Sequence, residues 1–500
     1  MHAPPAPPRA AKVARVSWWL SIILKKIILT KDHRLKGGRQ ETMSLWGGRF
    51  KEELHPLVKG FTFSARTDKK LYSFDIEGSI AHVKMLAKCG IIKEKEAGRI
   101  VKSLKEIKKD IQEGRIDLSQ KEDIHMAVEE EVIKREKDTG KKLHTARSRN
   151  DQISLDERLY LRDQIKDILQ LIHDFQYTLL HVADANKGVI IPGFTHLQYA
   201  QPVSLAHHIL AYFWMLQRDR ERFQDCYKRA NICPLGAGAL AGTSLPVDRE
   251  YVAKLLGFSG TTENSMDTVS DRDYLIEFLA CCSITMMHLS RLCEDIILWA
   301  SPCFDFVEIG EAFSTGSSLM PHKKNPDVAE LIRGKTGKVY GALFSLLVVM
   351  KALPLSYNRD MQEDKPSFFD ATEQVKFSIK ILTELIKNLR FNPEKMREKA
   401  EEGFFAATDL VEYLVGKGVP FRDAHKIVGK MVSWCVENKK NFASLTLDDY
   451  KKFSPFFEED VKKRINLEEC VVNKESKGGT GRKSLENQIK IAREKLERKP

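Results

Sequence analysis

The sequence predicts an all-α protein whose central part is a bundle of long helices. Over several long stretches apolar residues recur at alternating steps of three and four, the spacing that gives a helix one buried stripe. The alternation of apolar and polar residues that marks strands is scarce. The chain of 500 residues, 42% hydrophobic and 30% charged, has the composition of a globular protein of roughly three domains. This composition excludes collagen, a wholly disordered chain and a multi-pass membrane protein.

The chain divides into an N-terminal extension and three predicted helical domains. The domains are expected over residues 43–148, 149–397 and 398–500, with the long bundle in the second. Residues 1–42 hold nine basic and two acidic residues, so they carry +7 of the net charge of +12. Their longest uncharged run, residues 16–24, is too short to cross a bilayer, which takes about 20 residues. We expect this extension to be disordered and Met43 to begin the folded protein.

Five segments carry the helical repeat. They cover residues 161–182, 205–223, 275–296, 328–349 and 375–389. Ser154 and Ser270, each followed three residues later by an acidic residue, predict the N-caps of the first and third helices. Asn325 and Pro326 predict the N-cap and the first residue of the fourth. Helices with a repeat near 3.5 residues pack at shallow angles, and seams of roughly 30–50 Å favour contacts between subunits, so we expect a homo-oligomer.

The nine cysteines are an odd number and include no Cys-x-x-Cys pair. Cys281, Cys282 and Cys293 fall within one apolar helical repeat, so the cysteines are predicted to be small buried residues in a reducing compartment. The sequence lacks the clustered Cys and His ligands of a structural zinc site. We therefore expect a cytoplasmic protein without a bound metal.

The first of three polar segments between the helices is residues 143–152, which places Arg147, Arg149 and Asn150 before the first long helix. Taken alone, this segment favours a solvated, capped helix start. The alternative is a carboxylate site, because Arg binds carboxylates through two parallel hydrogen bonds and Asn both donates and accepts. Loops held on a rigid scaffold carry function disproportionately, which keeps the second interpretation open.

The second polar segment, residues 192–202, places Thr195, His196 and Gln198 between two prolines. A histidine in a loop is more often structural than catalytic. Here neighbouring polar groups can orient the imidazole, whose ordinary pKa of about 6.5 suits proton transfer. The segment therefore offers a candidate acid or base.

The third polar segment, residues 316–327, is the most specific. It places Ser317 ahead of Lys323 and Lys324, which lie at the start of the fourth helix. A helix N-terminus with adjacent lysines attracts anions. The segment could be a capped basic turn, but a Met-Pro pair inside a serine-rich loop is hard to explain in that way.

Together the three segments hold the groups for an elimination from an anionic substrate. Removing a proton next to a carboxylate creates an enolate-like dianion, which Lys323 and the helix terminus would stabilise. Ser317 and His196 are the candidate acid and base, and Ser317 would need activation by Lys323. Glu330, one turn into the fourth helix, could hydrogen-bond an imidazole from another subunit and raise its basicity.

These segments resemble the fumarase/aspartase superfamily of β-eliminating lyases, and specifically the argininosuccinate lyase family, to which the delta-crystallins of avian lenses are related. The superfamily motif Gly-Ser-Ser-x-Met-Pro-x-Lys-x-Asn-Pro occupies residues 316–326. Four further segments carry the resemblance to argininosuccinate lyases: residues 45–50, 145–152, 357–365 and 478–484. The resemblance covers nearly all of residues 43–500.

The resemblance implies cleavage of N-(L-arginino)succinate to fumarate and L-arginine, the last step of arginine biosynthesis, without a metal or an organic cofactor. It also implies a homotetramer, in which the long helices form a core of about 20 helices and each site takes loops from several subunits. His196 and Ser317 match the proton-transfer pair of the family, with the direction of transfer left open, and Lys323 and Glu330 match other catalytic residues. The substrate-binding positions fall on Ser64, Arg149, Asn150, Thr195, Asn325, Tyr357, Gln362 and Lys365. Three more positions near the substrate are Asp123, His125 and Gln198.

Three alternatives stay open. The first is another lyase of the superfamily, acting on adenylosuccinate, aspartate or fumarate, which the segments at 145–152 and 357–365 disfavour. The second is a non-catalytic structural protein of the crystallin type, which the presence of His196 and Ser317 disfavours. The third, nucleic-acid binding, is suggested by a pI near 9.0, but residues 43–500 carry only +5 in mixed charges. We therefore expect neither a nucleic-acid partner nor stable membrane association.

Overall fold

The computed structural model describes residues 53–497. The chain separates into two compact units, Met1–Val58 and Lys59–Pro500, and the second holds nearly all of the described residues. The expected extension over residues 1–42 and the motif at residues 45–50 lie outside the described residues. Nearly all regular structure in the second unit is helical, which confirms the all-α prediction. The division into three domains stays a prediction.

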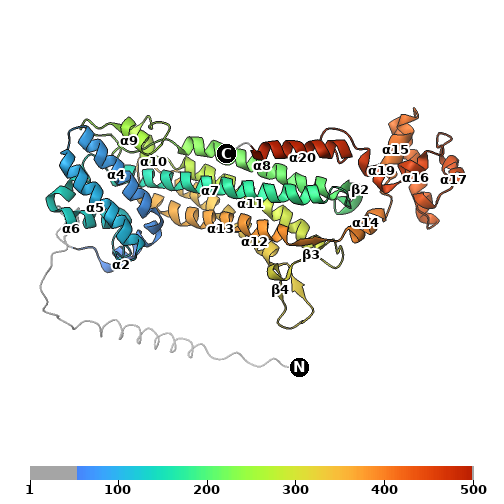
Figure 1. The fold of residues 1–500 in the computed structure, drawn as a ribbon, viewed down its shortest axis with the longest axis horizontal. Coiled ribbons are helices and arrows are strands. Elements are labelled where there is room, and N and C mark those ends of the chain that lie inside the picture. Colours follow the sequence, from blue (N-terminus) through green and yellow to red (C-terminus); the bar gives the residue numbers. More distant parts are fainter. Residues whose placement is uncertain (1–52, 498–500) are drawn as a thin grey trace, which may run out of the picture. The chain divides into compact units, whose positions relative to one another are not determined.

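Five long helices form the centre of this unit (Figure 1). They are α7 (Arg149–Ala185), α8 (Leu205–Ala230), α11 (Asp273–Trp299), α12 (Asp327–Met350) and α13 (Asp364–Lys387). α7 packs against α8 and α13, while α11 packs against α8, α12 and α13. The predicted apolar stripes form the core, where Ile165, Phe175, Leu279 and Ile379 are fully buried. All five predicted helices are therefore confirmed.

The predicted start of α7 is wrong by several residues. The helix begins at Arg149, and the capping box is formed by Ser148 and Asp151. Ser154 lies inside the helix and is fully buried. A serine followed three residues later by an acidic residue occurs at both Ser148 and Ser154, so the spacing alone could not select the cap.

The predicted starts of α11 and α12 also need correction. Ser270 does not cap α11; the Asp273 amide donates instead to Asp271 Oδ1 at 2.7 Å. Ser270 is the last residue of α10, a separate short helix. α12 begins at Asp327 with Pro326 in the N-cap position, one residue later than predicted. Proline fits at either position because neither requires a backbone N–H.

Shorter helices precede α7 in the chain. They are α2 (Pro56–Thr62), α3 (Ala65–Asp68), η2 (Lys69–Leu71), α4 (Tyr72–Lys88), α5 (Glu94–Gln112), α6 (Ile124–Glu136) and η3 (Lys137–Lys142). α4 packs against α5, α6 and α7, which brings side chains of α4 and α6 to the first turns of α7. Two further short helices, α9 (Arg249–Leu255) and α10 (Ser265–Ser270), lie between α8 and α11 in the chain.

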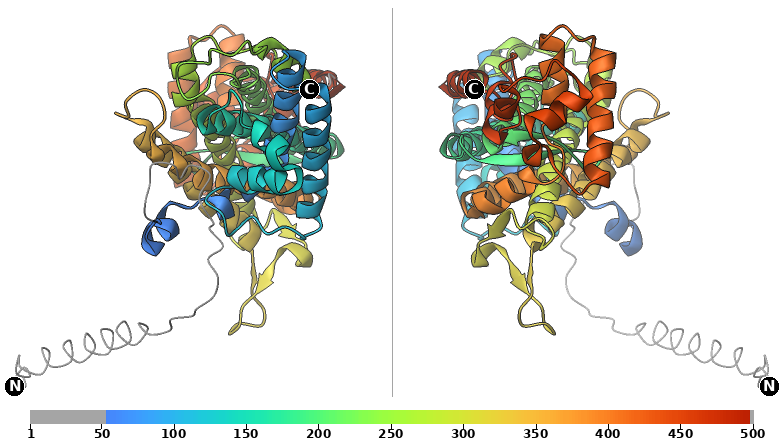
Figure 2. Two further views of the ribbon diagram at one scale, coloured as in Figure 1. Left: turned by 90° about the vertical axis from the view of Figure 1, so that its left-hand side faces the viewer. Right: turned by 90° about the vertical axis from the view of Figure 1, so that its right-hand side faces the viewer.

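After α13 the chain forms a second, smaller core. The helices are α14 (Pro393–Glu401), α15 (Ala407–Gly416), α16 (Phe421–Glu437), η6 (Phe442–Ser444), α17 (Leu447–Phe453), α18 (Val461–Arg464), α19 (Leu467–Val472) and α20 (Arg482–Glu497). Leu410, Met431 and Phe457 are fully buried in the small core, whose helices face the viewer on the right of Figure 2. α20 instead runs back along α7 and α8, where Leu485 and Ile489 join the main core.

The strands in the described part of the chain form three short antiparallel pairs. β1 (Ile190–Thr195) pairs with β2 (Gln198–Ser204), β3 (Val307–Ile309) with β6 (Leu389–Phe391), and β4 (Thr315–Gly316) with β5 (Lys324–Asn325). Two short 3-10 helices occur in this part of the chain: η4 (Glu311–Phe313) between β3 and β4, and η5 (Arg359–Glu363) between α12 and α13. The β4–β5 hairpin projects from the bundle in every view (Figures 1 and 2). Two of the three polar segments are thus held by strand pairing.

α11 is the one helix in residues 53–497 that is long and apolar enough to cross a membrane by length and composition. In the structure 61% of its apolar stretch is buried, and its neighbours are α8, α12 and α13. Its apolar residues therefore form the protein core. All nine cysteines are free. The prediction that they are buried is confirmed for seven of them, whereas Cys89 is half-buried and Cys303 is exposed.

Candidate active site

The first turn of α7 carries two predicted substrate-binding residues. Arg149 Nε lies 3.1 Å from Asp123 Oδ2, and Arg149 Nη1 donates to Gln152 Oε1 at 2.8 Å. Asn150 Nδ2 donates to the carbonyl oxygen of Ala239 at 3.2 Å. A guanidinium and an amide thus lie at a helix N-terminus, where the helix dipole also favours anions.

Ser64 and Gln362 are brought to this same end by the segments before α3 and after α12. The Ser64 amide donates to the carbonyl oxygen of Glu122 at 2.8 Å. Arg359 links the two segments, because its Nη2 lies 3.2 Å from Glu122 Oε1 and its Nε donates to Gln362 Oε1 at 3.3 Å. Since Asp123 directly follows Glu122, these contacts join Ser64 and Gln362 to the first turn of α7.

Lys365 lies in a buried network of charges and is only 3% exposed. Its Nζ donates to Asp364 Oδ1 at 2.9 Å and to Glu157 Oε1 at 3.3 Å. Arg272 Nε contacts the same two carboxylates at 2.6 and 3.2 Å. Burial alone would lower the pKa of Lys365, but the Asp364 and Glu157 carboxylates raise it above its ordinary value. Tyr357 lies within electrostatic range of this ammonium, and burial raises the pKa of its phenol.

His125 is held between two buried carboxylates. Its Nδ1 lies 3.0 Å from Asp75 Oδ1 and 3.2 Å from Asp156 Oδ2. The three side chains could hold a metal ion by their spacing, but an imidazolium also satisfies them. Burial alone would lower the pKa of His125, yet the two carboxylates, Asp75 above all, raise it to about 10. Burial raises the pKa of Asp156 to about 8, so the cluster holds protons at neutral pH.

His196 lies at the tip of the β1–β2 hairpin. His196 and Leu197 form the two-residue turn, with φ of 57° and 56°, and Thr195 pairs with Gln198 across it. Positive φ at both positions defines a type I′ turn, which normally takes Asn-Gly. A left-handed conformation costs about 1–2 kcal/mol per residue, and such strain clusters at functional sites. Thr195, His196 and Gln198 are all exposed in the single chain.

Ser317 follows β4 directly and is half-buried. Its Oγ accepts a hydrogen bond from the Met320 amide at 3.0 Å, which shapes the turn of the loop. Lys323 is exposed on the loop, and Asn325 closes it through the pairing of β5 with β4. Glu330 is exposed in the first turn of α12, as the sequence predicts.

One chain does not bring all these groups together. α7 has 37 residues and is therefore about 55 Å long, and it separates Arg149 from the hairpin that carries His196. α12 has 24 residues, about 36 Å, and separates Ser317 from Tyr357. The chain thus presents three groups of site residues at three places.

A glycine-rich segment that the sequence prediction missed lies beside Asn150. The amides of Gly236 and Gly238 donate to Asp151 Oδ2 at 3.0 and 2.9 Å, and both glycines have positive φ. Ala239 then accepts from Asn150. The signal in the sequence is the Gly-Ala-Gly run at residues 236–238, which permits the turn that an L-residue with a Cβ would resist.

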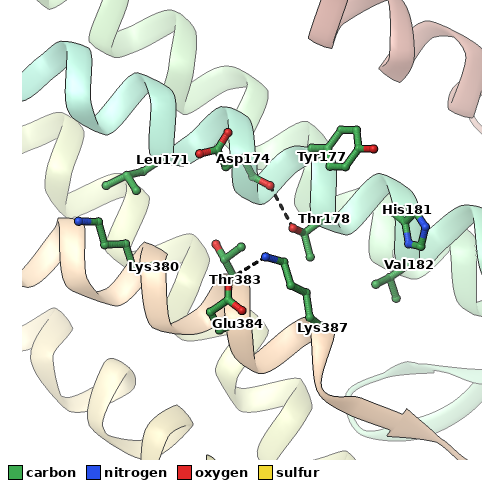
Figure 3. A pocket seen from close by; sticks show the side chains of 10 residues that line it. All are labelled: Leu171, Asp174, Tyr177, Thr178, His181, Val182, Lys380, Thr383, Glu384 and Lys387. Carbon is green, nitrogen blue, oxygen red and sulfur yellow. Dashed lines mark hydrogen bonds and ion pairs between the residues drawn. The ribbon is translucent and has the colours of Figure 1, made fainter.

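A groove of about 780 Å³ lies between α7 and α13 (Figure 3). It is lined by Leu171, Asp174, Tyr177, Thr178, His181, Val182, Lys380, Thr383, Glu384 and Lys387. None of the predicted site residues lines it. Its Lys387 is paired with Glu384 at 2.7 Å. Because the groove holds no predicted site residue, it does not mark the candidate active site.

The fold and the site segments together define a lyase. Residues 48–341 match the family model described as lyase, and residues 404–472 match the model described as argininosuccinate lyase C-terminal. Among solved structures, EDDS lyase in complex with formate superposes with a TM-score of 0.79 at 28% identity, covering 86% of this chain and 87% of that chain. Class II fumarase from Schistosoma mansoni shares the fold, with a TM-score of 0.66 at 17% identity over 81% of this chain and 92% of that chain.

Similarity to curated relatives narrows the class of lyases to one family. Argininosuccinate lyase from Syntrophus aciditrophicus is 56% identical over 446 residues, 89% of this chain and 94% of the relative. Argininosuccinate lyase from Acetivibrio thermocellus is 53% identical over 454 residues, 90% of this chain and 99% of the relative. The chain belongs to the argininosuccinate lyase family of the fumarase/aspartase superfamily.

Proposed function

We propose that the protein cleaves N-(L-arginino)succinate to fumarate and L-arginine in the cytoplasm, as the last step of arginine biosynthesis. The observation that carries the proposal is the identity of 50–56% to argininosuccinate lyases over about nine-tenths of the chain. The cluster of Ser64, Arg149, Asn150 and Gln362 supports it, because a substrate with several carboxylates needs converging donors and cations.

The reaction is a β-elimination. A base removes a proton from the carbon next to a carboxylate, and the resulting enolate-like dianion is stabilised by Lys323 and the N-terminus of α12. The electrons then form the carbon–carbon double bond of fumarate as the bond to the guanidinium nitrogen breaks. That nitrogen takes a proton from an acid and leaves as arginine. His196 and Ser317 share the two proton transfers, and Glu330 orients His196.

Substrate binding is assigned to the hydrogen-bond donors near the start of α7 and to the polar residues that flank the two proton-transfer residues, His196 and Ser317. Arg149, Lys365 and the helix N-terminus supply fixed positive charge. The remaining contacts are assigned to Ser64, Asn150, Thr195, Gln198, Asn325, Tyr357 and Gln362, with Asp123 and His125 supporting them. The mechanism calls for no metal or organic cofactor, since protein cations stabilise the dianion.

The complete site is assembled in a homotetramer. In one chain Arg149 is separated from His196 by the length of α7, and Ser317 from Tyr357 by the length of α12, so these groups meet only when different copies contribute them. α12 supports this assembly, because Leu331, Phe344 and Leu347 are 62%, 69% and 46% exposed on it in the single chain. An apolar helix face of this kind is typical of an interface between subunits.

The deciding experiment is an assay of the full chain with argininosuccinate, in which fumarate is followed by ultraviolet absorbance and arginine is measured separately. We expect both products in equal amounts. Adenylosuccinate and aspartate serve as competing substrates, and fumarate formed from either, but not from argininosuccinate, would contradict the proposal. A protein inactive on all three would favour the structural, crystallin-like alternative.

A further inference from the structure

A closed ring of contacts joins the first turn of α7 to the buried His125. Gln152 is 2% exposed; its Oε1 accepts from Arg149 Nη1 at 2.8 Å and its Nε2 donates to Asp75 Oδ1. The same Asp75 oxygen lies 3.0 Å from His125 Nδ1. The ring closes through Asp123, the N-cap of α6 two residues before His125, whose Oδ2 lies 3.1 Å from Arg149 Nε. The guanidinium is therefore held by two routes that both lead to His125.

The burial of Asp156 beside this ring costs folding free energy. Its Oδ2 lies 3.2 Å from the His125 nitrogen that already faces Asp75, and one N–H cannot donate fully to two carboxylates. Both carboxyl oxygens of Asp156 are fully buried, and neither has a hydrogen-bond partner among the residues the structure describes. Replacing buried ionic groups by apolar ones is often neutral or stabilising. The cluster therefore needs a reason other than stability, and its link to Arg149 through Gln152 provides one.

We propose that Asp75, His125 and Asp156 form a positioning cluster that acts through Gln152 to fix the Arg149 guanidinium for one carboxylate of the substrate. The inference rests on the proposed function, which makes Arg149 a substrate ligand. An arginine side chain that is already ordered loses less conformational entropy when it binds a carboxylate. Asp75, Gln152 and Asp156 are thus positioning residues, which act on the substrate through Arg149.

The test measures binding of succinate, a four-carbon dicarboxylate, to the full chain by isothermal titration calorimetry. Gln152→Met removes the hydrogen-bonded link between Arg149 and Asp75, and Asp75→Asn removes the charge that faces His125, both at nearly constant volume. We expect succinate to bind about tenfold more weakly to either variant, and L-arginine to bind as to the wild type. In turnover assays KM for argininosuccinate is expected to rise about tenfold while kcat changes by less than about threefold.

A double-mutant cycle separates positioning from general damage. Arg149→Gln alone is expected to weaken succinate by at least as much as Asp75→Asn. If Asp75 acts only through Arg149, the double variant binds succinate no more weakly than Arg149→Gln alone.

Asp219→Asn is the matched control. Asp219 Oδ2 lies 2.7 Å from His288 Nδ1, and both side chains are buried. The pair joins α8 to α11 and makes no contact with Arg149. This variant is expected to lower the melting temperature to a similar extent as Asp75→Asn while leaving succinate affinity unchanged.

Three results would overturn the positioning role. The first is wild-type succinate affinity in Asp75→Asn and Gln152→Met. The second is a double variant in which the two losses of affinity add, and the third is an equal loss of succinate affinity in Asp219→Asn. A fourth would be a melting temperature that millimolar Mn²⁺ raises in the wild type but not in Asp75→Asn, because the cluster would then hold a metal. Succinate binding does not depend on turnover. A wild type that binds succinate through the ring but does not cleave argininosuccinate would overturn the proposed function alone.

Discussion

His196 and Ser317 are the two residues on which the proposed elimination depends most. His196 lies at the turn of the β1–β2 hairpin and Ser317 directly follows β4, so neither takes part in the packing of the apolar stripes. We expect Ser317→Ala and His196→Asn each to lower kcat by at least about a hundredfold, because each removes one proton transfer. Size-exclusion chromatography should show an unchanged oligomer. Near-normal turnover in either variant would remove that residue from the mechanism.

Asp156 gives the fold a pH dependence that can be measured. Burial raises its pKa to about 8, whereas an unfolded aspartate titrates near about 3.9. The folded chain thus retains a proton that the unfolded chain has released, so the contribution of Asp156 to stability is complete below about pH 4 and is lost as the pH rises to about 8. Asp156→Asn stays neutral throughout this range.

Melting temperatures of the wild type and Asp156→Asn between pH 5 and 9 test this assignment. The wild type is expected to lose more stability than the variant as the pH rises to 8, and the two curves should run in parallel above it. Curves that are parallel over the whole range would show that Asp156 is ionised in the folded protein.

At the scale of elements, the β1–β2 hairpin combines strain with exposure. Leu197 has a φ of 56° and is 69% exposed, so its side chain offers little compensation within one chain. Leu197→Gly should relieve about 1 kcal/mol of backbone strain and raise the melting temperature. Leu355→Gly is the matched control: Leu355 is 70% exposed and has no positive φ, so glycine there should lower the melting temperature. A lower melting temperature in both variants would contradict the strain argument.

The same hairpin shows where sequence reasoning stops. The long helices could be predicted because an apolar stripe must repeat along the whole element, whereas a cap depends on one hydrogen bond that a neighbouring serine can make equally well, as with Ser148 and Ser154. The hairpin around His196 is short, and its turn lacks the Asn-Gly that marks type I′ turns, so the sequence predicts only a loop there.

The residues of the candidate site also divide into those that the sequence could predict and those that it could not. Ser317, Lys323 and Asn325 lie in one contiguous motif and could be named from the sequence. Asp75 and Asp156 could not, because they come from separate helices, stand in no motif, and acquire their role only where α4 and α7 pack together. Long-range side-chain contacts of this kind have no periodic signature.

At the scale of the whole molecule, the separation of the three groups predicts complementation. In the proposed tetramer, His196 and Ser317 of one site come from different chains. If His196→Asn and Ser317→Ala chains are unfolded together and refolded as mixed tetramers, about one site in four receives both normal residues. Activity should therefore return to about a quarter of the wild-type value, while each variant refolded alone stays inactive. A mixture as inactive as its components would place both residues of a site on one chain.

The lengths of α7 and α12 also have a genetic consequence. Because these helices hold the three groups of site residues at different places, every chain in the proposed assembly would contribute to several sites. A chain defective in all three groups would therefore inactivate each of those sites. When half of the chains are defective, only about one-eighth of the sites would be intact. A defective allele would therefore be expected to act dominantly, suppressing the product of a normal copy well beyond the loss of one gene dose.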